Sequence, residues 1–279
     1  MIDKQTTEDP LYKLLCRHFV ALHVEIARVD GTLWTPLRSG FLLELEGTYF
    51  WISAGHAVKR LLEPLDRGCT FKRAFLSDLG MTPHFVPPEF GNAEPSTQFD
   101  FLRAPKFYID EDGIDVAAIE LNDLYSAMLL ANGAEAIQIS HVGLTEWQAN
   151  PYFILGAPEE FTETFTDDGL PAIQFVPVMW RLKRLPDEIK DGVMRLRFDV
   201  GANQITSGGK LQESMEGMSG GPIFGLKLDK DGKQRYYAVA IQSSWLPKSK
   251  IAFGCPLDRF AGFLHGLVTN SIEELREQG

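Results

Sequence analysis

The chain is poor in cysteine, in basic charge and in long apolar runs, and each shortage argues against a class of protein. Its 279 residues include only three cysteines, Cys16, Cys69 and Cys255, which are odd in number and widely spaced. This pattern argues against a disulfide framework and lacks metal-ligand spacing, so we expect reduced thiols and no metal. No apolar stretch is long enough to cross a membrane as a helix, and we expect no membrane contact.

The charge balance of the chain is acidic. Lys and Arg number 27 against 38 Asp and Glu, which gives a formal net charge of -11. Contact with a phosphate backbone requires clustered Lys and Arg, so we expect no nucleic-acid partner. The densest basic run, residues 181–184 (RLKR), is typical of a solvated strand face. Residues 1–10 are charged and lack the apolar core of a secretory signal, which predicts a cytoplasmic location.

Residues 217–222 (GMSGGP) are the most informative segment of the sequence. Glycines on both sides of Ser219 allow the backbone to bend tightly and to present N–H groups to an oxyanion. We therefore take Ser219 as a candidate nucleophile for acyl transfer, and the N–H groups of Gly217 and Ser219 as a candidate oxyanion hole. A glycine-rich hairpin turn without chemistry is the alternative for this segment taken alone.

A serine nucleophile needs a base, and His56 has suitable surroundings. It lies in residues 51–58 (WISAGHAV), where an apolar strand ends in small residues that leave the imidazole uncrowded. The strand is preceded by two apparent hairpin strands, residues 39–45 and 47–51. The other histidines lack such a turn and are expected to serve packing or the surface: His18, His23, His84, His141 and His265.

The third group should be a carboxylate that orients the imidazole. Asp115 opens residues 115–121 (DVAAIEL), whose small and apolar side chains would bury one carboxylate. Nearby competitors are Asp100, Asp110 and Asp112, which lie among polar or loop residues where a solvated charge is expected. We prefer Asp115.

In the order His56, Asp115, Ser219, these segments resemble the motifs of the chymotrypsin/trypsin-like serine peptidase family, in its compact bacterial form without disulfides. The resemblance covers roughly residues 24–268. Residues 152–158 (YFILGAP) are similar to the strand that begins the family's second barrel, and residues 238–245 (AVAIQSSW) to the strand that pairs with extended substrate. The resemblance implies an all-β fold of two packed antiparallel six-stranded β-barrels, with His56 and Asp115 in the first and Ser219 in the second.

The activity that the resemblance implies is that of a cytoplasmic serine endopeptidase. His56 would take the proton of Ser219, Asp115 would orient the imidazole, and no metal or organic cofactor would be needed. The implied partner is a protein or peptide substrate, and a regulatory partner protein is left open. Regulated processing in a bacterial stress or defence pathway is the expected role. The rivals are a catalytically silent protease-fold scaffold or sensor, and an esterase with the same three residues.

Specificity is harder to predict. Glu213 stands six residues before Ser219, where a carboxylate selects Lys or Arg in trypsin-like members, although an exposed turn residue is the alternative. The glycine that normally follows Ser-Trp and keeps the pocket mouth open is absent after Trp245. A side chain at that wall would exclude a long basic substrate residue and favour a small one. Met218 replaces the Asp of zymogen-activated members, so we expect no N-terminal activation cut. The expected substrate-binding residues are Glu213, Ser214, Ser243, Ser244 and Trp245.

We expect a single peptidase domain over residues 1–279. An N-terminal helix over residues 1–22 would carry one apolar stripe, formed by Leu11, Leu14, Leu15, Phe19 and Leu22. The predicted segments that follow are a first barrel over 23–135, a second barrel over 136–256 and C-terminal helices over 257–279, the last starting at a capping box at Ser271. A long connection over 61–110, which contains residues 87–92 (PPEFGN), is the predicted lid, and residues 229–233 the predicted hairpin turn.

Overall fold

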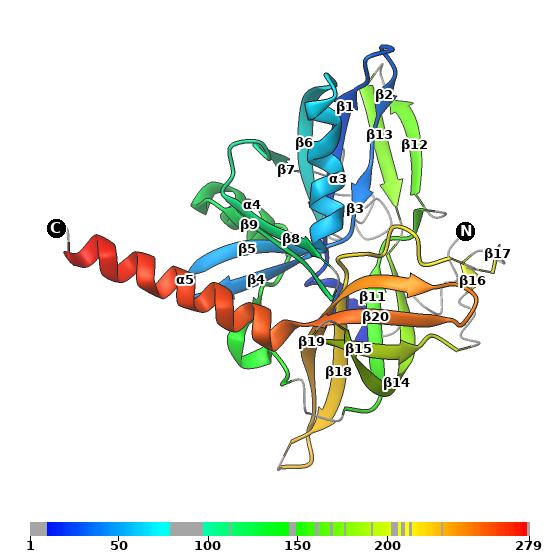
Figure 1. Ribbon diagram of the computed structural model, residues 1–279, viewed down its shortest axis with the longest axis vertical. Helices are drawn as coiled ribbons and strands as arrows, with labels where there is room; N and C mark the ends of the chain where they lie inside the picture. The colour runs from blue at the N-terminus through cyan, green and yellow to red at the C-terminus, as the bar shows by residue number, and fades with distance from the viewer. Residues whose placement is uncertain are drawn as a thin grey trace.

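The computed structural model describes residues 10–78, 97–111, 113–144, 149–159, 162–167, 170–175, 177–190, 192–201, 206–207, 210–211, 214–229 and 231–277. The fold is all-β, with two groups of strands packed against each other and helices at their margins (Figure 1). We call residues 10–138 the first half and residues 152–256 the second half. A core cluster that includes Phe41, Ile52, Leu155 and Phe224 lies between them.

The N-terminal helix is shorter than predicted. Helix α2 covers Pro10–Cys16, and strand β1 (Val20–Ala27) begins where the apolar spacing had predicted further helix. Strand β1 is almost wholly buried and pairs along its length with β6 (Thr70–Asp78). Strand pairing and burial therefore outweigh the helical spacing of Phe19 and Leu22, as tertiary context commonly does.

The first half consists of two five-stranded sheets, where we expected one closed six-stranded barrel. The first sheet contains, in order, β2 (Leu33–Trp34), β1, β6 and β7 (Thr97–Phe99), with β3 (Leu37–Arg38) also paired to β1. The second contains, in order, β10 (Ile137–Gln138), β4 (Phe41–Leu45), β5 (Thr48–Ser53), β9 (Ile114–Leu121) and β8 (Lys106–Glu111).

The two sheets of the first half meet at one corner, between β1 and β4. There the Val20 N–H donates to the Gly40 carbonyl (3.0 Å) and the Leu42 N–H donates to the His18 carbonyl (3.2 Å). Strand β10 pairs in parallel with β4, so the first half extends to Gln138, slightly beyond the predicted boundary.

Much of the predicted lid is regular structure. Helix α3 (Gly55–Asp66) and strands β6, β7 and β8 occupy most of residues 61–110 that the structure describes. Residues 87–92 lie outside the described residues. Helix α4 (Asp123–Ala131) also belongs to this half, and the 3-10 turn η3 (Ile139–His141) follows its last strand.

The second half is a closed antiparallel barrel, as predicted. Its strands are, in barrel order, β11 (Tyr152–Gly156), β14 (Val178–Lys190), β15 (Val193–Asp199), β20 (Ile251–Pro256), β19 (Gln234–Leu246) and β18 (Pro222–Leu228), which pairs back to β11. Two small hairpins accompany the barrel, β12 (Thr162–Asp167) with β13 (Leu170–Phe175) and β16 (Thr206–Ser207) with β17 (Lys210–Leu211). The predicted turn at 229–233 joins β18 to β19, with the Asp229 N–H donating to the Lys233 carbonyl (2.8 Å).

The C-terminus forms one helix, α5 (Leu257–Glu277), in which Ser271 is an internal residue and starts no second helix. Leu257, Phe260, Ala261 and Leu264 recur at helical spacing and pack into the core between the halves. The later turns of α5 extend away from the sheets (Figure 1). No helix in the described part of the chain is long and apolar enough to cross a membrane.

Candidate active site

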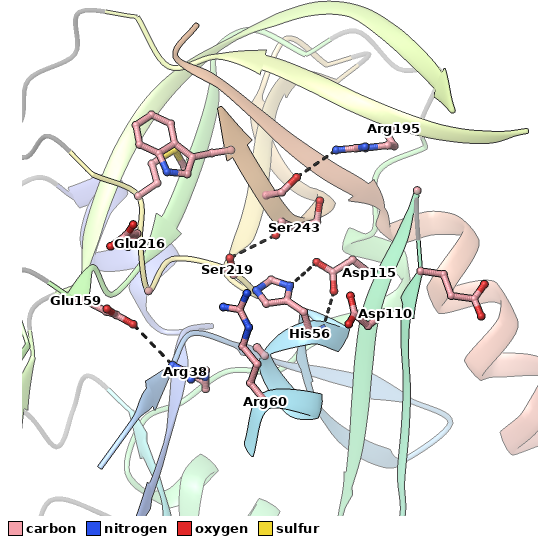
Figure 2. A pocket seen from close by; sticks show the side chains of 17 residues that line it. Arg38, His56, Arg60, Asp110, Asp115, Glu159, Arg195, Glu216, Ser219 and Ser243 are labelled. Atoms are coloured by element: carbon pink, nitrogen blue, oxygen red, sulfur yellow. Dashed lines mark hydrogen bonds and ion pairs between the residues drawn. The ribbon is translucent and has the colours of Figure 1, made fainter. Parts of the chain in front are cut away.

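A cavity of about 620 Å³ collects most of the side chains that the sequence predicted (Figure 2). His56 and Asp115 line it from the first half, and Ser219 lines it from the second. The fold therefore brings three residues that are far apart in the sequence to the wall of one cavity.

His56 and Asp115 form a closely paired unit. His56 lies in the first turn of α3, and Asp115 lies near the start of β9. One carboxylate oxygen, Oδ1, accepts the His56 backbone N–H (2.8 Å), and the other, Oδ2, lies 2.7 Å from His56 Nδ1. Since first-turn N–H groups lack acceptors within the helix, and a helix N-terminus favours negative charge, the carboxylate suits this place. An ionised carboxylate only accepts, so Nδ1 carries the hydrogen and Nε2 is the basic nitrogen.

Gly55 explains the small residues that precede His56. A Cβ atom at Gly55 would collide with the backbone carbonyls of Ile109 on β8 and Val116 on β9. The absence of a side chain lets α3 begin directly against these two strands. That close approach places His56 within reach of Asp115.

Ser219 lies on the turn that leads into β18. Gly217 (φ 88°) and Gly220 (φ 94°) adopt the left-handed conformation that glycine tolerates best, one on each side of it. The Ser219 hydroxyl donates a long hydrogen bond of 3.4 Å to the Ser243 carbonyl. Within the described part of the chain, no hydrogen bond joins Ser219 to His56.

The predicted oxyanion hole has unused donors. The backbone N–H groups of Gly217 and Ser219 find no acceptor among the described residues. Between them, Met218 is fully buried, and its N–H donates to the Met215 carbonyl (3.0 Å). The turn is thus fixed through Met218 while its two neighbouring N–H groups stay available to an anion.

The first half supports this turn through Ser39, a fully buried residue that the sequence did not single out. Its hydroxyl donates to the Gly217 carbonyl (2.8 Å) and accepts the Ala157 N–H (2.9 Å). A Cβ atom at Gly220 would collide with the Ser53 hydroxyl and the Ser39 carbonyl, so the turn lies directly on the first half. No local pattern marks Ser39, because both partners of its hydroxyl lie more than a hundred residues away.

The second half supports Asp115 in return, through Cys255 on β20. Cys255 Sγ accepts the Asp115 backbone N–H at 3.3 Å and lies 3.9 Å from the Gly113 carbonyl, to which the thiol can donate. Burial raises the pKa of this thiol to about 11, so it stays protonated at neutral pH. The sequence predicted only that Cys255 is a free thiol.

The competing carboxylates and histidines have other surroundings. Asp110 lines the cavity but is ion-paired with Lys59 (2.8 Å), Asp100 accepts the Arg103 backbone N–H (3.3 Å), and Asp112 lies outside the described residues. His84 lies outside the described residues. The other four histidines do not line the cavity: His18, His23, His141 and His265. Asp115 is the carboxylate that the structure pairs with an imidazole in the cavity.

Three of the five predicted substrate-binding residues line the cavity, namely Ser243, Ser244 and Trp245. Ser214 does not, and its hydroxyl accepts the Glu216 backbone N–H (3.1 Å). Glu213 lies outside the described residues, so its predicted role in selecting Lys or Arg stays a prediction.

Three arginines that the sequence did not single out also line the cavity, Arg38, Arg60 and Arg195. Arg195 lies over the Phe253 ring at 4.1 Å and donates to the Ser244 hydroxyl (3.2 Å). Among the described residues, no group of three or more His, Cys, Asp or Glu could hold a metal ion.

No protein-family model and no curated protein matches the chain, but solved structures do. They include a thermostable serine protease, AL20, from an extremophilic microorganism, with 12% identity, a TM-score of 0.48, and coverage of 86% of this chain and 91% of that one. An inactive serine-to-alanine mutant of Rv3671c from M. tuberculosis H37Rv has 12% identity, a TM-score of 0.44 and coverage of 96% and 95%. Protease Anisep from Arthrobacter nicotinovorans has 13% identity, a TM-score of 0.45 and coverage of 86% and 90%. The likeness is distant, so function is inferred below from the geometry of the cavity.

Proposed function

We propose that this protein is a serine endopeptidase that cleaves protein substrates through an acyl-enzyme on Ser219. The observation that carries the proposal is the His56–Asp115 pair, held by contacts of 2.7 and 2.8 Å at the wall of the cavity that Ser219 also lines. An imidazole whose Nδ1 is held by a carboxylate is prepared to act as a base through Nε2.

The proposed reaction uses each of these groups in turn. His56 Nε2 takes the proton of the Ser219 hydroxyl as its oxygen attacks the peptide carbonyl, and Asp115 stabilises the imidazolium. The N–H groups of Gly217 and Ser219 bind the oxyanion of the tetrahedral intermediate. His56 then protonates the leaving amine, and a water molecule that His56 activates hydrolyses the ester. The long Ser219 to Ser243 hydrogen bond is weak enough to be exchanged for one to His56.

One observation favours the rival function, a silent scaffold or sensor. Ser219 donates to Ser243 and not to His56 within the described structure. The peptidase is the better account, because binding alone requires neither a paired imidazole nor two backbone N–H groups without acceptors. The cytoplasmic location, the bacterial origin, the regulated processing of a few substrates in a stress or defence pathway and a regulatory partner are sequence-based expectations that we retain within the proposal.

The proposal is tested by incubating the purified protein with a peptide pool and identifying new termini by mass spectrometry. We expect cleavage by the wild type and none by Ser219→Ala or His56→Ala. Asp115→Asn should lower kcat by about 10⁴-fold, since the amide disturbs the imidazole tautomer. Circular dichroism and thermal unfolding should show that the variants remain folded. Cleavage by Ser219→Ala at the wild-type rate, or a folded wild type that cleaves nothing, would overturn the proposal.

A further inference from the structure

The cavity wall on the α3 side of Ser219 carries two arginines. Arg38 comes from β3, and Arg60 comes from α3, four residues after His56. Residues at that spacing share one face of a helix, so Arg60 lies next to His56. Figure 2 shows the Arg60 side chain extending from α3 toward His56 and Ser219, with Arg38 to its left.

Arg38 is largely buried and incompletely paired. Its side chain is 13% exposed, and its nearest carboxylate, Glu159 Oε1, lies 3.9 Å from Nη1, too far for a hydrogen bond. Nη1 donates to the Leu37 carbonyl (2.9 Å), while the buried Nε has no hydrogen-bond partner. Burial lowers the pKa of the guanidinium to about 10, although Glu159 opposes the shift. The guanidinium also lies over the Trp34 ring, 5.9 Å from its centroid, which compensates the charge in part. A largely buried charge with an unpaired Nε remains unfavourable unless a ligand completes its shell.

Arg60 adds a second uncompensated charge to the same wall. Its side chain is exposed, and no described carboxylate forms an ion pair with it. It also lies near enough to Arg38 to disfavour the charged form of that residue. Two like charges without a bound anion repel each other, whereas a carboxylate between them would be attracted to both and can accept paired hydrogen bonds from a guanidinium.

The reaction geometry decides which part of a substrate meets these arginines. Because His56 delivers the proton to the leaving amine, that amine must lie at His56. Substrate residues that follow the amine therefore pass the face of α3 that carries Arg60. Ser243 and Arg195 lie across Ser219 from this wall in Figure 2 and would face the acyl side of the substrate.

We infer that Arg38 and Arg60 form a carboxylate-binding subsite on the leaving-group side, and that the enzyme prefers Asp or Glu within the first two residues after the cut bond. This inference rests on the proposed function. The net charge of -11 would repel acidic substrates at a distance, so the preference must arise from these local contacts. Glu111, Glu159 and Glu216 also line the cavity. Glu159 is 64% exposed and 3.9 Å from Arg38, so a substrate carboxylate would compete with it for the guanidinium.

The test uses matched peptides that carry Glu or Gln at the first or second position after the cut, each with a free or amidated C-terminus. We expect the Glu peptides to have a kcat/KM about tenfold or more above that of the Gln peptides, as hydrogen bonds to charged groups provide. The preference should fall to near one in Arg60→Gln and in Arg38→Gln. Arg38→Lys should retain part of it, because the charge remains while the guanidinium geometry is lost.

The charge-matched control is Arg67→Gln. Arg67 follows α3 and is paired with Glu63 (3.9 Å) outside the cavity, so its variant loses the same charge without changing the subsite. The control should keep the Glu preference, and so should Arg195→Gln, which alters the opposite wall. An equal loss in Arg67→Gln would show a long-range field and overturn the inference.

Other outcomes also decide the question. Equal rates for Glu and Gln peptides in the wild type would overturn the subsite, as would an unchanged preference in Arg60→Gln. A preference that depends on the free C-terminus and not on Glu would assign the arginines to a terminal carboxylate and contradict the side-chain preference. If no peptide is cleaved, the affinities of Ser219→Ala for the Glu and the Gln peptide pools still test the subsite. A Glu preference there that Arg60→Gln abolishes would support the subsite while the proposed function fails.

Discussion

In the first half, His56 lies on helix α3, directly after strand β5, and Asp115 lies on strand β9, which pairs with β5. Ser219 of the second half lies instead on a turn that both halves support. The contacts of 2.7 and 2.8 Å between His56 and Asp115 link two segments of the first half, α3 and β9. The turn instead receives a hydrogen bond from Ser39 across the interface, and Gly220 lies against Ser39 and Ser53.

This difference separates the two tasks of the candidate site. The proton-accepting unit depends mainly on packing within the first half, with Cys255 as one contact from the second. The nucleophile and its oxyanion donors depend on how the two halves meet. Changes at the turn and at the interface should therefore lower activity more than changes elsewhere that cost a similar amount of stability, and the following variants test this expectation.

Among variants of the turn and the interface, the largest effect is expected from Gly217→Ala. Gly217 has φ 88°, and an added Cβ would lie 2.7 Å from the Glu159 backbone nitrogen and 2.8 Å from the Ala157 carbonyl oxygen, so the turn must shift. Displacing an oxyanion donor lowers kcat by about 10²-fold or more. Steady-state kinetics on a cleaved peptide measures the change.

The control is Gly232→Ala in the β18–β19 turn. Gly232 has φ 73° but no atom within 4 Å of the added Cβ, so the variant has the same kind of backbone strain without the crowding. We expect a loss of about 1 kcal/mol in stability and wild-type kcat. Similar kcat values for the two variants would mean that the turn at Gly217 does not set the chemistry.

A smaller effect is expected from Ser39→Ala, which breaks the link between the halves. The variant leaves the Gly217 carbonyl and the Ala157 N–H without their buried partner, which costs about 1–3 kcal/mol per group. We expect kcat/KM to fall about tenfold as the turn loses its support. Denaturant unfolding and kinetics give the two quantities separately.

Ser53→Ala is the matched control for the interface. Ser53 is also a fully buried serine and also lies against Gly220, but the hydrogen bond of its hydroxyl, to the Ser39 carbonyl (2.8 Å), stays inside the first half. It should lose stability to a similar degree while keeping more of its activity than Ser39→Ala. The reverse order would show that the first half, and not the interface, governs the turn.

The sequence predicted the parts of this site that local patterns encode. Small residues around His56, the buried strand that begins near Asp115 and the glycines around Ser219 all act within a few residues of the group they serve. The closed second barrel followed from the family resemblance and is confirmed.

The remaining features depend on residues that are distant in sequence. The helix predicted through Leu22 gives way to strand β1 because β6 pairs with it, which helical spacing alone does not reveal. Ser39 contacts the Gly217 carbonyl, and Arg38 lines the cavity, only because the fold places the end of β3 beside the turn at Gly217. Neither role is visible in the local sequence. The separation of the first half into two sheets likewise depends on pairing between remote strands.

The most direct test of the central claim, that Ser219 is an activated nucleophile, is intact-mass detection of a fluorophosphonate adduct. The wild type should gain the mass of one adduct, Ser219→Ala should gain none, and His56→Ala should react far more slowly because the base is lost. Labelling of Ser219→Ala at the wild-type rate, or no labelling of a folded wild type, would contradict the account.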